Sequence, residues 1–214
     1  MRTEQIDRIS PHCVVGQCTA EGLGDWFHKS STKASSNYGI DKNGRIGLYV
    51  EEKNRSWCTS SNANDQRAVT IECASDKAEP YAMHQVVYDR LVDLCEDICR
   101  RNGKKKLLWF GDKNKSLNYQ PKADEMLITV HRWFANKSCP GDWLYARLGD
   151  LAAKVTSRLG SGNVEVISSG MQAGEFQGLT EEQVLAKVGP LFTADQKKSG
   201  ILASVSMAQF VLES

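Results

Sequence analysis

The stretch Ala68-Val69-Thr70-Ile71-Glu72-Cys73 alternates between apolar and polar side chains, a pattern that predicts a half-buried β-strand. Successive side chains of a strand point to opposite faces, so Val69, Ile71 and Cys73 share one face. Glu72 and the threonine two residues before it share the other. We therefore expect a strand of the protein core that carries a carboxylate on one face.

Apolar patterns on both sides of this strand extend the prediction to a sheet covered by helices. A turn over residues 41–44 leads into an expected strand. Apolar side chains at 3.6-residue spacing predict amphipathic helices over residues 82–102 and 142–159. The further strands are expected over residues 46–50, 107–110 and 127–130. Interleaved strands and helices predict an α/β protein with a central mixed β-sheet flanked by helices.

Composition divides the 214-residue chain into three parts. Residues 1–160 carry the tryptophans, the cysteines and the strong apolar periodicity. Residues 161–178 are rich in glycine and serine, and we interpret them as a linker. Residues 179–214 open with Thr180-Glu181-Glu182-Gln183, a capping box that predicts the start of a helix, and two more short helical segments follow. A segment this short is not expected to form a stable core alone.

Charge and hydropathy exclude several classes of protein. The chain has 27 Lys and Arg against 26 Asp and Glu, a net charge of +1, so no electrostatic nucleic-acid binder is expected. No segment approaches the roughly 18–20 apolar residues of a membrane span. The first ten residues lack an apolar core, so no cleaved signal peptide is expected. We therefore expect synthesis in the cytoplasm.

The seven cysteines are an odd number, so at least one is unpaired in a monomer. Without an export signal we expect a reducing compartment, where cysteines are more often buried, catalytic or metal-bound. Cys95 falls on the apolar stripe of the helix expected over residues 82–102, and we expect it to pack with Cys99. A redox-labile pair between Cys13 and Cys18 stays open.

His131 and Cys139 are the first candidates for a metal site. An expected strand leads into His131, and a loop then leads to Cys139 at the turn formed by Pro140-Gly141. Imidazole nitrogen and thiolate sulfur are the ligands that zinc prefers. His12 follows another short extended stretch, and three protein ligands with one open position are typical of catalytic zinc. A core histidine and a buried cysteine are the alternative interpretation.

Glu72 and Lys137 are the candidates for acid–base chemistry. Burying Glu72 without a partner is costly, whereas a strand that aims it into a cleft makes it a general base toward zinc-activated water. The ammonium of Lys137, two residues before Cys139, would stabilise an oxyanion there. The alternatives are a solvent-facing glutamate and a loop lysine in water. His28 and His84 lack such a setting and are expected to be exposed.

Several short motifs follow one another in a fixed order: Ile9-Ser10-Pro11-His12, residues 34–40 with Asn43-Gly44, residues 62–72, His131, and Lys137-Ser138-Cys139-Pro140-Gly141. Together they resemble the zinc-dependent N-acetylmuramoyl-L-alanine amidases with the type-2 amidase or peptidoglycan-recognition fold. The resemblance covers about residues 5–160. It is strongest to the endolysins and autolysins of clostridia, related Gram-positive bacteria and their phages.

The resemblance implies a set of residues and roles: His12, His131 and Cys139 as zinc ligands, Glu72 and Lys137 as catalytic residues, and Asn37, Trp57 and Asn62 as substrate contacts. The implied reaction is zinc-dependent hydrolysis of the amide that joins N-acetylmuramic acid to L-alanine in peptidoglycan. The implied place of action is the cell wall, reached by release on lysis or by another export route. An oligomeric state is not implied.

Three positions depart from the family pattern. Cys13 stands where many members have a second histidine, Cys58 stands where many have the histidine of a Trp-His pair, and Ser36 holds the place of a tyrosine used by some phage enzymes. Two other functions stay open. One is a non-catalytic peptidoglycan-binding module of the same fold. The other is a cysteine-nucleophile hydrolase that uses Cys58 or Cys73 with a histidine, although no spacing orders such a pair.

The end of the chain carries a second resemblance. Residues 189–192, 198–205 and 207–214 are similar to the opening of a bacterial endo-β-N-acetylglucosaminidase domain, with Glu213 at the position of the general acid. Glycoside hydrolysis needs that acid held in a formed cleft, so we expect no glycosidase activity here. We expect the chain to be cut from, or to end within, a two-enzyme protein.

Overall fold

Residues 1–160, together with residues 180, 183, 186 and 189, are described by the structure, a computed structural model. The chain divides into two units between Gly160 and Ser161. The expected linker lies outside the described residues, as does the glucosaminidase-like segment, Glu213 included, apart from the four residues just named, and both stay predictions. The capping box is confirmed: the Thr180 N–H donates to Gln183 Oε1 at 2.9 Å, and the Gln183 N–H donates to Thr180 Oγ1 at 3.4 Å.

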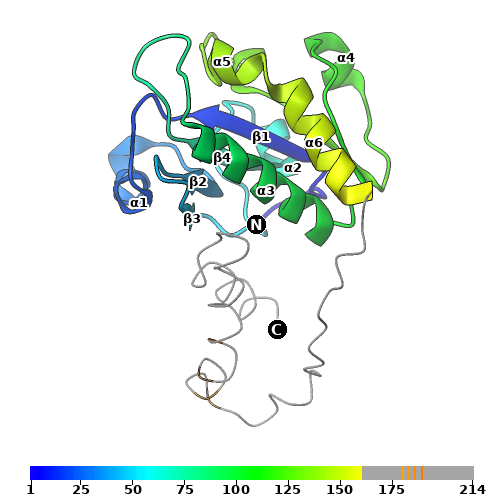
Figure 1. Cartoon of the computed structure of the whole chain (residues 1–214). Helices are drawn as coiled ribbons and strands as arrows, with labels where there is room; N and C mark the ends of the chain where they lie inside the picture. Colours follow the sequence, from blue (N-terminus) through cyan, green and yellow to red (C-terminus); the bar gives the residue numbers. More distant parts are fainter. Residues whose placement is uncertain (161–179, 181–182, 184–185, 187–188, 190–214) are drawn as a thin grey trace. The chain divides into compact units, whose positions relative to one another are not determined.

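A six-stranded sheet in the order β3-β2-β4-β1-β6-β5 is the centre of residues 1–160 (Figure 1). The strands are β1 (Arg8–Cys13), β2 (Tyr38–Ile40), β3 (Ile46–Leu48), β4 (Ala68–Cys73), β5 (Lys106–Leu108) and β6 (Glu125–Ile128). Neighbouring strands run parallel except β2 and β3, which are antiparallel. The predicted class, a mixed sheet flanked by helices, is confirmed.

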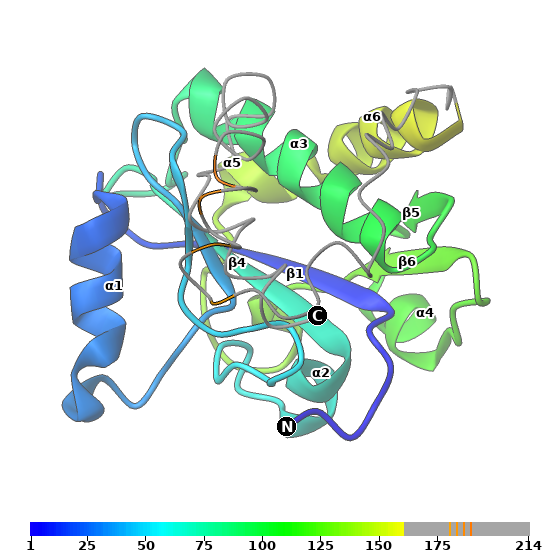
Figure 2. The ribbon, with the colours of Figure 1, turned by 90° about the horizontal axis from the view of Figure 1, so that it is seen from below.

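Helices lie on both faces of the sheet (Figure 2). They are α1 (Ala20–His28), α2 (Asn62–Arg67), α3 (Gln85–Arg101), α4 (Lys113–Asn118), α5 (Asp142–Tyr145) and α6 (Leu148–Gly160), with the 3₁₀ turns η1 (Ser30–Thr32) and η2 (His131–Trp133). The α3 and α6 helices pack together over one face, and α2 lies on the other. Within the described part of the chain, no helix has the length and apolarity needed to cross a bilayer.

The apolar stripe predicted for α3 is buried in the core. Val87, Leu91, Leu94 and Ile98 are all buried, as their 3.6-residue spacing predicts. Burying four such side chains stabilises the fold by roughly 1.5–3 kcal/mol each. The helix therefore anchors the face of the sheet that lies away from α2.

One predicted strand, over residues 46–50, ends early. The N–H groups of Tyr49 and Val50 both donate to the single carbonyl of Asn37, at 2.9 and 3.4 Å. Two residues then oppose one, which interrupts a ladder as a β-bulge does. As a result, β3 stops at Leu48.

Two more strands differ from their predicted bounds. The strand expected over residues 107–110 runs from Lys106 to Leu108 and ends before Trp109, whose indole stacks on Trp133 with ring centroids 5.1 Å apart. The strand expected over residues 127–130 lies two residues earlier, over Glu125–Ile128. An apolar pattern does not mark the start of this strand, because its first residue is charged.

The helix predicted over residues 142–159 is in fact two helices, α5 and α6. The Arg147 N–H donates to the Leu144 carbonyl at 2.9 Å, a three-residue turn that interrupts the α-helical ladder. Leu144 and Leu148 are fully buried on either side of this turn, so the apolar spacing does not show it. The α3 helix begins three residues later than predicted because His84 is extended.

The pairing of β1 positions the functional site. Along its whole length β1 pairs with β4, which places His12 opposite Glu72. On its other side it pairs with β6 only at its first two residues, and the Ile9 carbonyl accepts from the chain that follows β6. The backbone groups of successive β1 residues face β4 and β6 in turn, so the nitrogen of Pro11 faces β6. The pairing with β6 has already ended there, so the missing N–H of proline costs no hydrogen bond between the strands. The two strands separate there, just before His12.

Candidate metal centre

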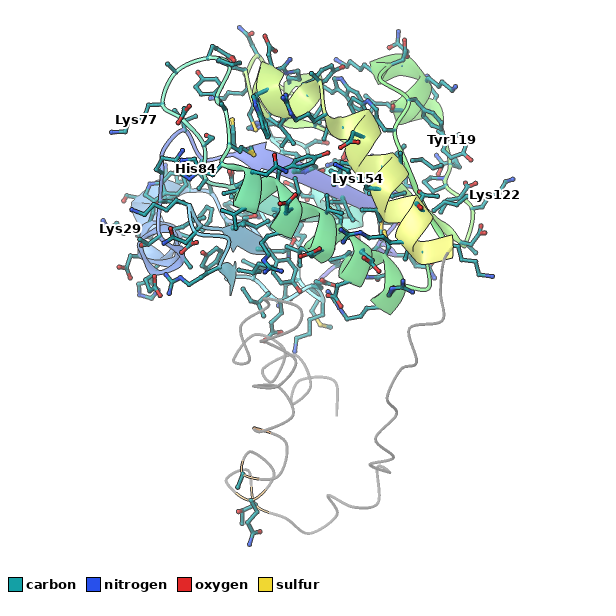
Figure 3. All side chains as sticks on the ribbon, viewed as in Figure 1. Lys29, Lys77, His84, Tyr119, Lys122 and Lys154 are labelled. Carbon is teal, nitrogen blue, oxygen red and sulfur yellow. The ribbon has the colours of Figure 1, made fainter. Side chains whose placement is uncertain are left out.

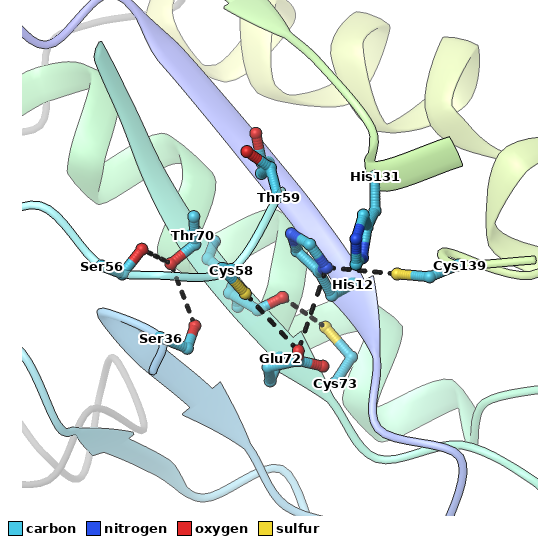
Figure 4. A network of polar contacts seen from close by, with 12 residues as sticks. His12, Ser36, Ser56, Cys58, Thr59, Thr70, Glu72, Cys73, His131 and Cys139 are labelled. Carbon is cyan, nitrogen blue, oxygen red and sulfur yellow. Dashed lines mark hydrogen bonds and ion pairs between the residues drawn. The ribbon is translucent and has the colours of Figure 1, made fainter. Parts of the chain in front are cut away.

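Three side chains from separate elements meet at the carboxyl end of β1 (Figure 4). His12 lies on β1, His131 opens η2 directly after β6, and Cys139 lies in the loop before α5. One ligand atom of each lies within 4.8 Å of the others. Cys139 Sγ is 3.2 Å from His12 Nδ1, and the two imidazole centroids are 5.2 Å apart. The structure thus brings together the three residues expected to bind metal.

The geometry and electrostatics of this group fit a tetrahedral divalent cation. Zinc bonds of 2.0–2.1 Å to nitrogen and 2.3 Å to sulfur place two ligand atoms about 3.5 Å apart, close to the Cys139–His12 separation. His12 is 1% exposed, and its Nε2 has no hydrogen-bond partner. Burial and then the nearby His131 lower the His12 pKa to about 3. The ring is therefore neutral, the form that binds metal.

The surroundings of the Cys139 thiol favour its protonated form. A hydrogen bond with the Cys13 thiol, and then burial, raise the pKa of Cys139 well above its ordinary value. A coordinated cation favours the thiolate and reverses this effect. All seven cysteines, Cys13 and Cys18 included, are free in the structure.

Glu72 lies beside this group on β4. Its Oε1 is 3.9 Å from His12 Nδ1, while its Oε2 is buried without a hydrogen-bond partner. Burial raises the Glu72 pKa to about 8, and a hydrogen bond from Cys58 opposes part of the rise. A largely buried carboxyl group with one unpaired oxygen and a pKa near neutrality is suited to general acid–base chemistry.

A second group of potential ligands, His12, Cys58 and Glu72, also has its ligand atoms within 4.8 Å of one another. It shares His12 with the first group, so both belong to one site of five residues, here called the pocket: His12, Cys58, Glu72, His131 and Cys139. Burial raises the pKa of Cys58 and of Cys73 well above the ordinary thiol value. Both thiols therefore stay protonated, which weakens the cysteine-nucleophile alternative.

Three of the other predicted site residues are exposed. Lys137 is exposed, and its charge lowers the pKa of His131, although burial is the larger cause. Trp57 is 57% exposed, with the Arg55 guanidinium 5.2 Å from its ring centroid. Asn62 is the exposed first residue of α2. Their roles toward a substrate stay predictions.

Asn37 has a different setting from the one expected of a substrate contact. It is fully buried, and its amide group donates to the carbonyls of Val50 and Asn54 at 3.0 and 3.2 Å. Its Oδ1 accepts from the Thr70 N–H at 3.2 Å. These bonds tie the loop after β3 to β4, so the structure gives Asn37 a role in the fold instead.

His28 and His84 are exposed, as predicted, and neither belongs to a potential metal-binding group among the described residues. Figure 3 shows His84 on the outside, where its Nδ1 is 3.2 Å from the Lys42 carbonyl. The two remaining histidines are thus the ones at the pocket.

Comparison with known families agrees with this geometry. The family described as N-acetylmuramoyl-L-alanine amidase (Amidase_2) matches residues 2–142. The chain belongs to this family. Its enzyme class is therefore amide hydrolysis between N-acetylmuramic acid and L-alanine, which makes it a peptidoglycan hydrolase. No curated protein sequence matches the chain.

Solved structures share the fold of the amidase at low sequence identity. The structure of PlyL has a TM-score of 0.52 at 14% identity and covers 72% of this chain and 86% of PlyL. The amidase LysC from Clostridium intestinale has a TM-score of 0.50 at 14% identity, over 70% of this chain and 85% of LysC. These similarities concern the arrangement of strands and helices.

Two residues that contact the amidase pocket were not predicted in these roles. Cys58 donates its S–H to Glu72 Oε1 at 3.5 Å, and Ser60 Oγ lies 2.9 Å from His131 Nε2. No periodicity or ligand spacing marks them, because both reach the pocket from a loop. The position of Cys58 beside Trp57, where the sequence departs from the family pattern, is the one signal that pointed to this loop.

Proposed function

We propose that this amidase is zinc-dependent, with His12, His131 and Cys139 as the ligands. The observation that carries the proposal is the convergence of two imidazoles and a thiol whose ligand atoms lie within 4.8 Å of one another. When bound there, Zn²⁺ supplies Lewis-acid polarisation of the scissile carbonyl and increases the acidity of water. Three protein ligands leave a position open for substrate.

Glu72 is the proposed general base and general acid. Its unpaired Oε2 accepts a proton from the attacking water, whose oxygen bonds to the carbonyl carbon. The same carboxyl group then returns the proton to the nitrogen of L-alanine as the C–N bond breaks. The products are a free carboxylate on the muramic acid side and a free amino group on L-alanine. A pKa raised by burial to about 8 suits a group that both takes and gives a proton.

Lys137 is the proposed electrostatic partner of the carbonyl oxygen. Burial and then the charge of Lys137 lower the pKa of His131, which supports a position of the ammonium near the proposed ligands. Solvent screens an exposed charge, so we expect Lys137→Met to lower kcat by about tenfold, less than the loss of a buried oxyanion donor. Zinc content should stay unchanged.

The substrate surface that we propose includes Trp57 and Asn62. Trp57 offers a largely exposed indole directly before Cys58, and aromatic faces pack well against sugar rings and peptide. Trp57→Ala should raise KM more than it lowers kcat. Peptidoglycan as substrate also implies action at the cell wall, reached by lysis or export.

The experiment that tests the proposed function is digestion of purified peptidoglycan by the zinc-loaded protein. We expect new L-alanine amino termini, and these should be absent after treatment with a chelator and return when Zn²⁺ is added. Muropeptides left unchanged by zinc-loaded protein would overturn the proposal.

A further inference from the structure

Residues 58–60 form a short loop, here called the 58–60 loop, that contacts two sides of the pocket. Cys58 Sγ donates to Glu72 Oε1 at 3.5 Å, and Ser60 Oγ lies 2.9 Å from His131 Nε2. The intervening Thr59 is buried, and its side chain points away from Glu72 and His131. One three-residue segment thus touches the proposed base on β4 and a proposed metal ligand at the start of η2.

A buried carboxylate on α2 holds this loop in place. Asp65 is 3% exposed, and its Oδ1 accepts from the Thr59 hydroxyl at 2.6 Å and from the Thr59 N–H at 3.2 Å. Its Oδ2 accepts from the Cys58 N–H, also at 3.2 Å. These three bonds fix the backbone between the two side chains that reach the pocket.

The backbone at Ser60 shows how firmly the loop is held. Its φ of 62° lies in the left-handed region, which a residue other than glycine rarely adopts. Such a conformation persists where surrounding contacts determine it. Here it directs the hydroxyl of Ser60 to His131.

We propose that the 58–60 loop is a positioning element of the amidase and that its two ends act separately. Ser60 fixes the ring of His131 through Nε2 and so leaves Nδ1 as the atom that binds metal. Cys58 holds Oε1 of Glu72 and so leaves Oε2 for the water. Partners of this kind orient metal ligands, and their loss commonly weakens metal affinity or activity by 10- to 100-fold. The inference rests on the proposed function.

The first test measures zinc affinity by competition with a chromophoric chelator. We expect Ser60→Ala and Ser60→Gly to weaken zinc binding by about tenfold or more, because both lack the hydroxyl. Ser31→Ala, an exposed serine in η1, is the matched control and should equal wild type. Glycine relieves the left-handed backbone. If only Ser60→Gly bound zinc like wild type, backbone strain and not the missing hydroxyl would explain the weaker binding of Ser60→Ala. If both variants bound zinc like wild type, the hydroxyl would have no role in zinc binding. Either result overturns the proposal for Ser60.

The second test reads the ring of His131 directly. In long-range ¹H–¹⁵N spectra of zinc-loaded protein we expect Nδ1 to be the coordinated nitrogen and Nε2 to carry the proton. In metal-free protein, Ser60→Ala should shift the Nε2 resonance of His131 while that of the exposed His84 stays in place. Coordination through Nε2, or an unchanged Nε2 resonance in Ser60→Ala, would contradict the assignment.

The third test concerns Cys58. Cys58→Ala should lower kcat by about tenfold, with KM and zinc affinity near wild type, because it releases Glu72 and leaves the ligands in place. Cys58→Ser keeps a donor and should restore most of kcat. Cys99→Ala, a buried cysteine on α3, controls for loss of a sulfur atom. An unchanged kcat in Cys58→Ala, or a serine variant as impaired as the alanine variant, would overturn the role of Cys58.

Failure of the proposed function is distinguishable from failure of this inference. Wild-type protein that binds no zinc or cleaves no peptidoglycan counts against the function itself. The Nε2 resonance in metal-free protein still decides whether Ser60 holds His131, because that measurement needs neither metal nor substrate.

Discussion

Strand β4 carries two polar side chains on one face, Thr70 and Glu72, and their surroundings differ completely (Figure 4). The Thr70 hydroxyl lies 2.7 Å from that of Ser56 and 3.1 Å from that of Ser36, and it accepts from the Asn37 N–H at 3.1 Å. Glu72, two residues further on, leaves its Oε2 buried and unpaired. The polar groups around Thr70 all find hydrogen-bond partners within the protein, whereas those around Glu72 do not.

The difference separates a structural cluster from a functional one. An unsatisfied buried polar group costs about 1–3 kcal/mol, so folding alone favours the arrangement around Thr70. At the candidate metal centre, His12 Nε2 and Glu72 Oε2 lack hydrogen-bond partners. Burial lowers the pKa of His12 and raises that of Glu72, so it favours the neutral form of both. This agrees with the proposed metal and substrate site. Substitutions there should therefore affect zinc binding and turnover, whereas substitutions around Thr70 should affect stability.

The largest effect is expected from Cys139→Ser at the metal centre. The variant replaces the sulfur ligand with a weaker oxygen ligand, so we expect zinc to be lost and peptidoglycan cleavage to fall below detection. Elemental analysis and a muropeptide assay on the same preparation measure both. A variant that retains zinc and wild-type turnover would show that Cys139 is not a ligand.

Glu72→Gln should come next. It keeps the shape of the side chain and removes the base, so we expect kcat to fall by about 10²- to 10⁴-fold. Zinc content should stay at the wild-type level, which distinguishes this variant from Cys139→Ser. Loss of zinc in Glu72→Gln would instead place Glu72 among the ligands.

The stability of metal-free protein should report the burial of Glu72 through its pH dependence. Its pKa of about 8 in the folded protein exceeds the ordinary 4.5, so folding takes up a proton between these values. The stabilisation is present below pH 4.5 and is lost as the pH rises through 8. Glu72→Gln cannot titrate, so urea unfolding should show wild type losing on the order of a few kcal/mol relative to it over this range. A parallel pH dependence of the two proteins would contradict the burial of this carboxyl group.

The smallest effect is expected in the cluster around Thr70. Thr70→Val removes a hydroxyl that accepts from the Asn37 N–H, so the free energy of unfolding should fall by about 1–3 kcal/mol. Zinc affinity should not change. Loss of zinc in this variant would show that the two clusters are coupled through β4.

How much of this was predictable depends on how far along the chain each signal extends. The two faces of β4 and the apolar stripe of α3 follow from local periodicity, because apolar residue types mark the buried positions. The interruption between α5 and α6 does not, since Leu144 and Leu148 keep the apolar spacing through it. A three-residue turn leaves little trace in an apolar pattern.

The candidate site shows the same limit. His12, His131 and Cys139 came from ligand chemistry together with a family resemblance, and only the pairing of β1 with β4 and β6 explains why they meet. Asn37 illustrates the opposite case, because a motif residue that serves the fold looks the same in sequence as one that binds substrate. Ser60 had no signal, since its contact depends on the backbone of a loop.

The most direct test of the account is the metal content of the purified chain, measured by elemental analysis for wild type and for His12→Ala. The account predicts one zinc ion per wild-type chain and almost none in a His12→Ala protein that remains folded. Wild-type protein that binds no zinc from zinc-containing buffer, or a His12→Ala protein that keeps a full equivalent, would contradict it.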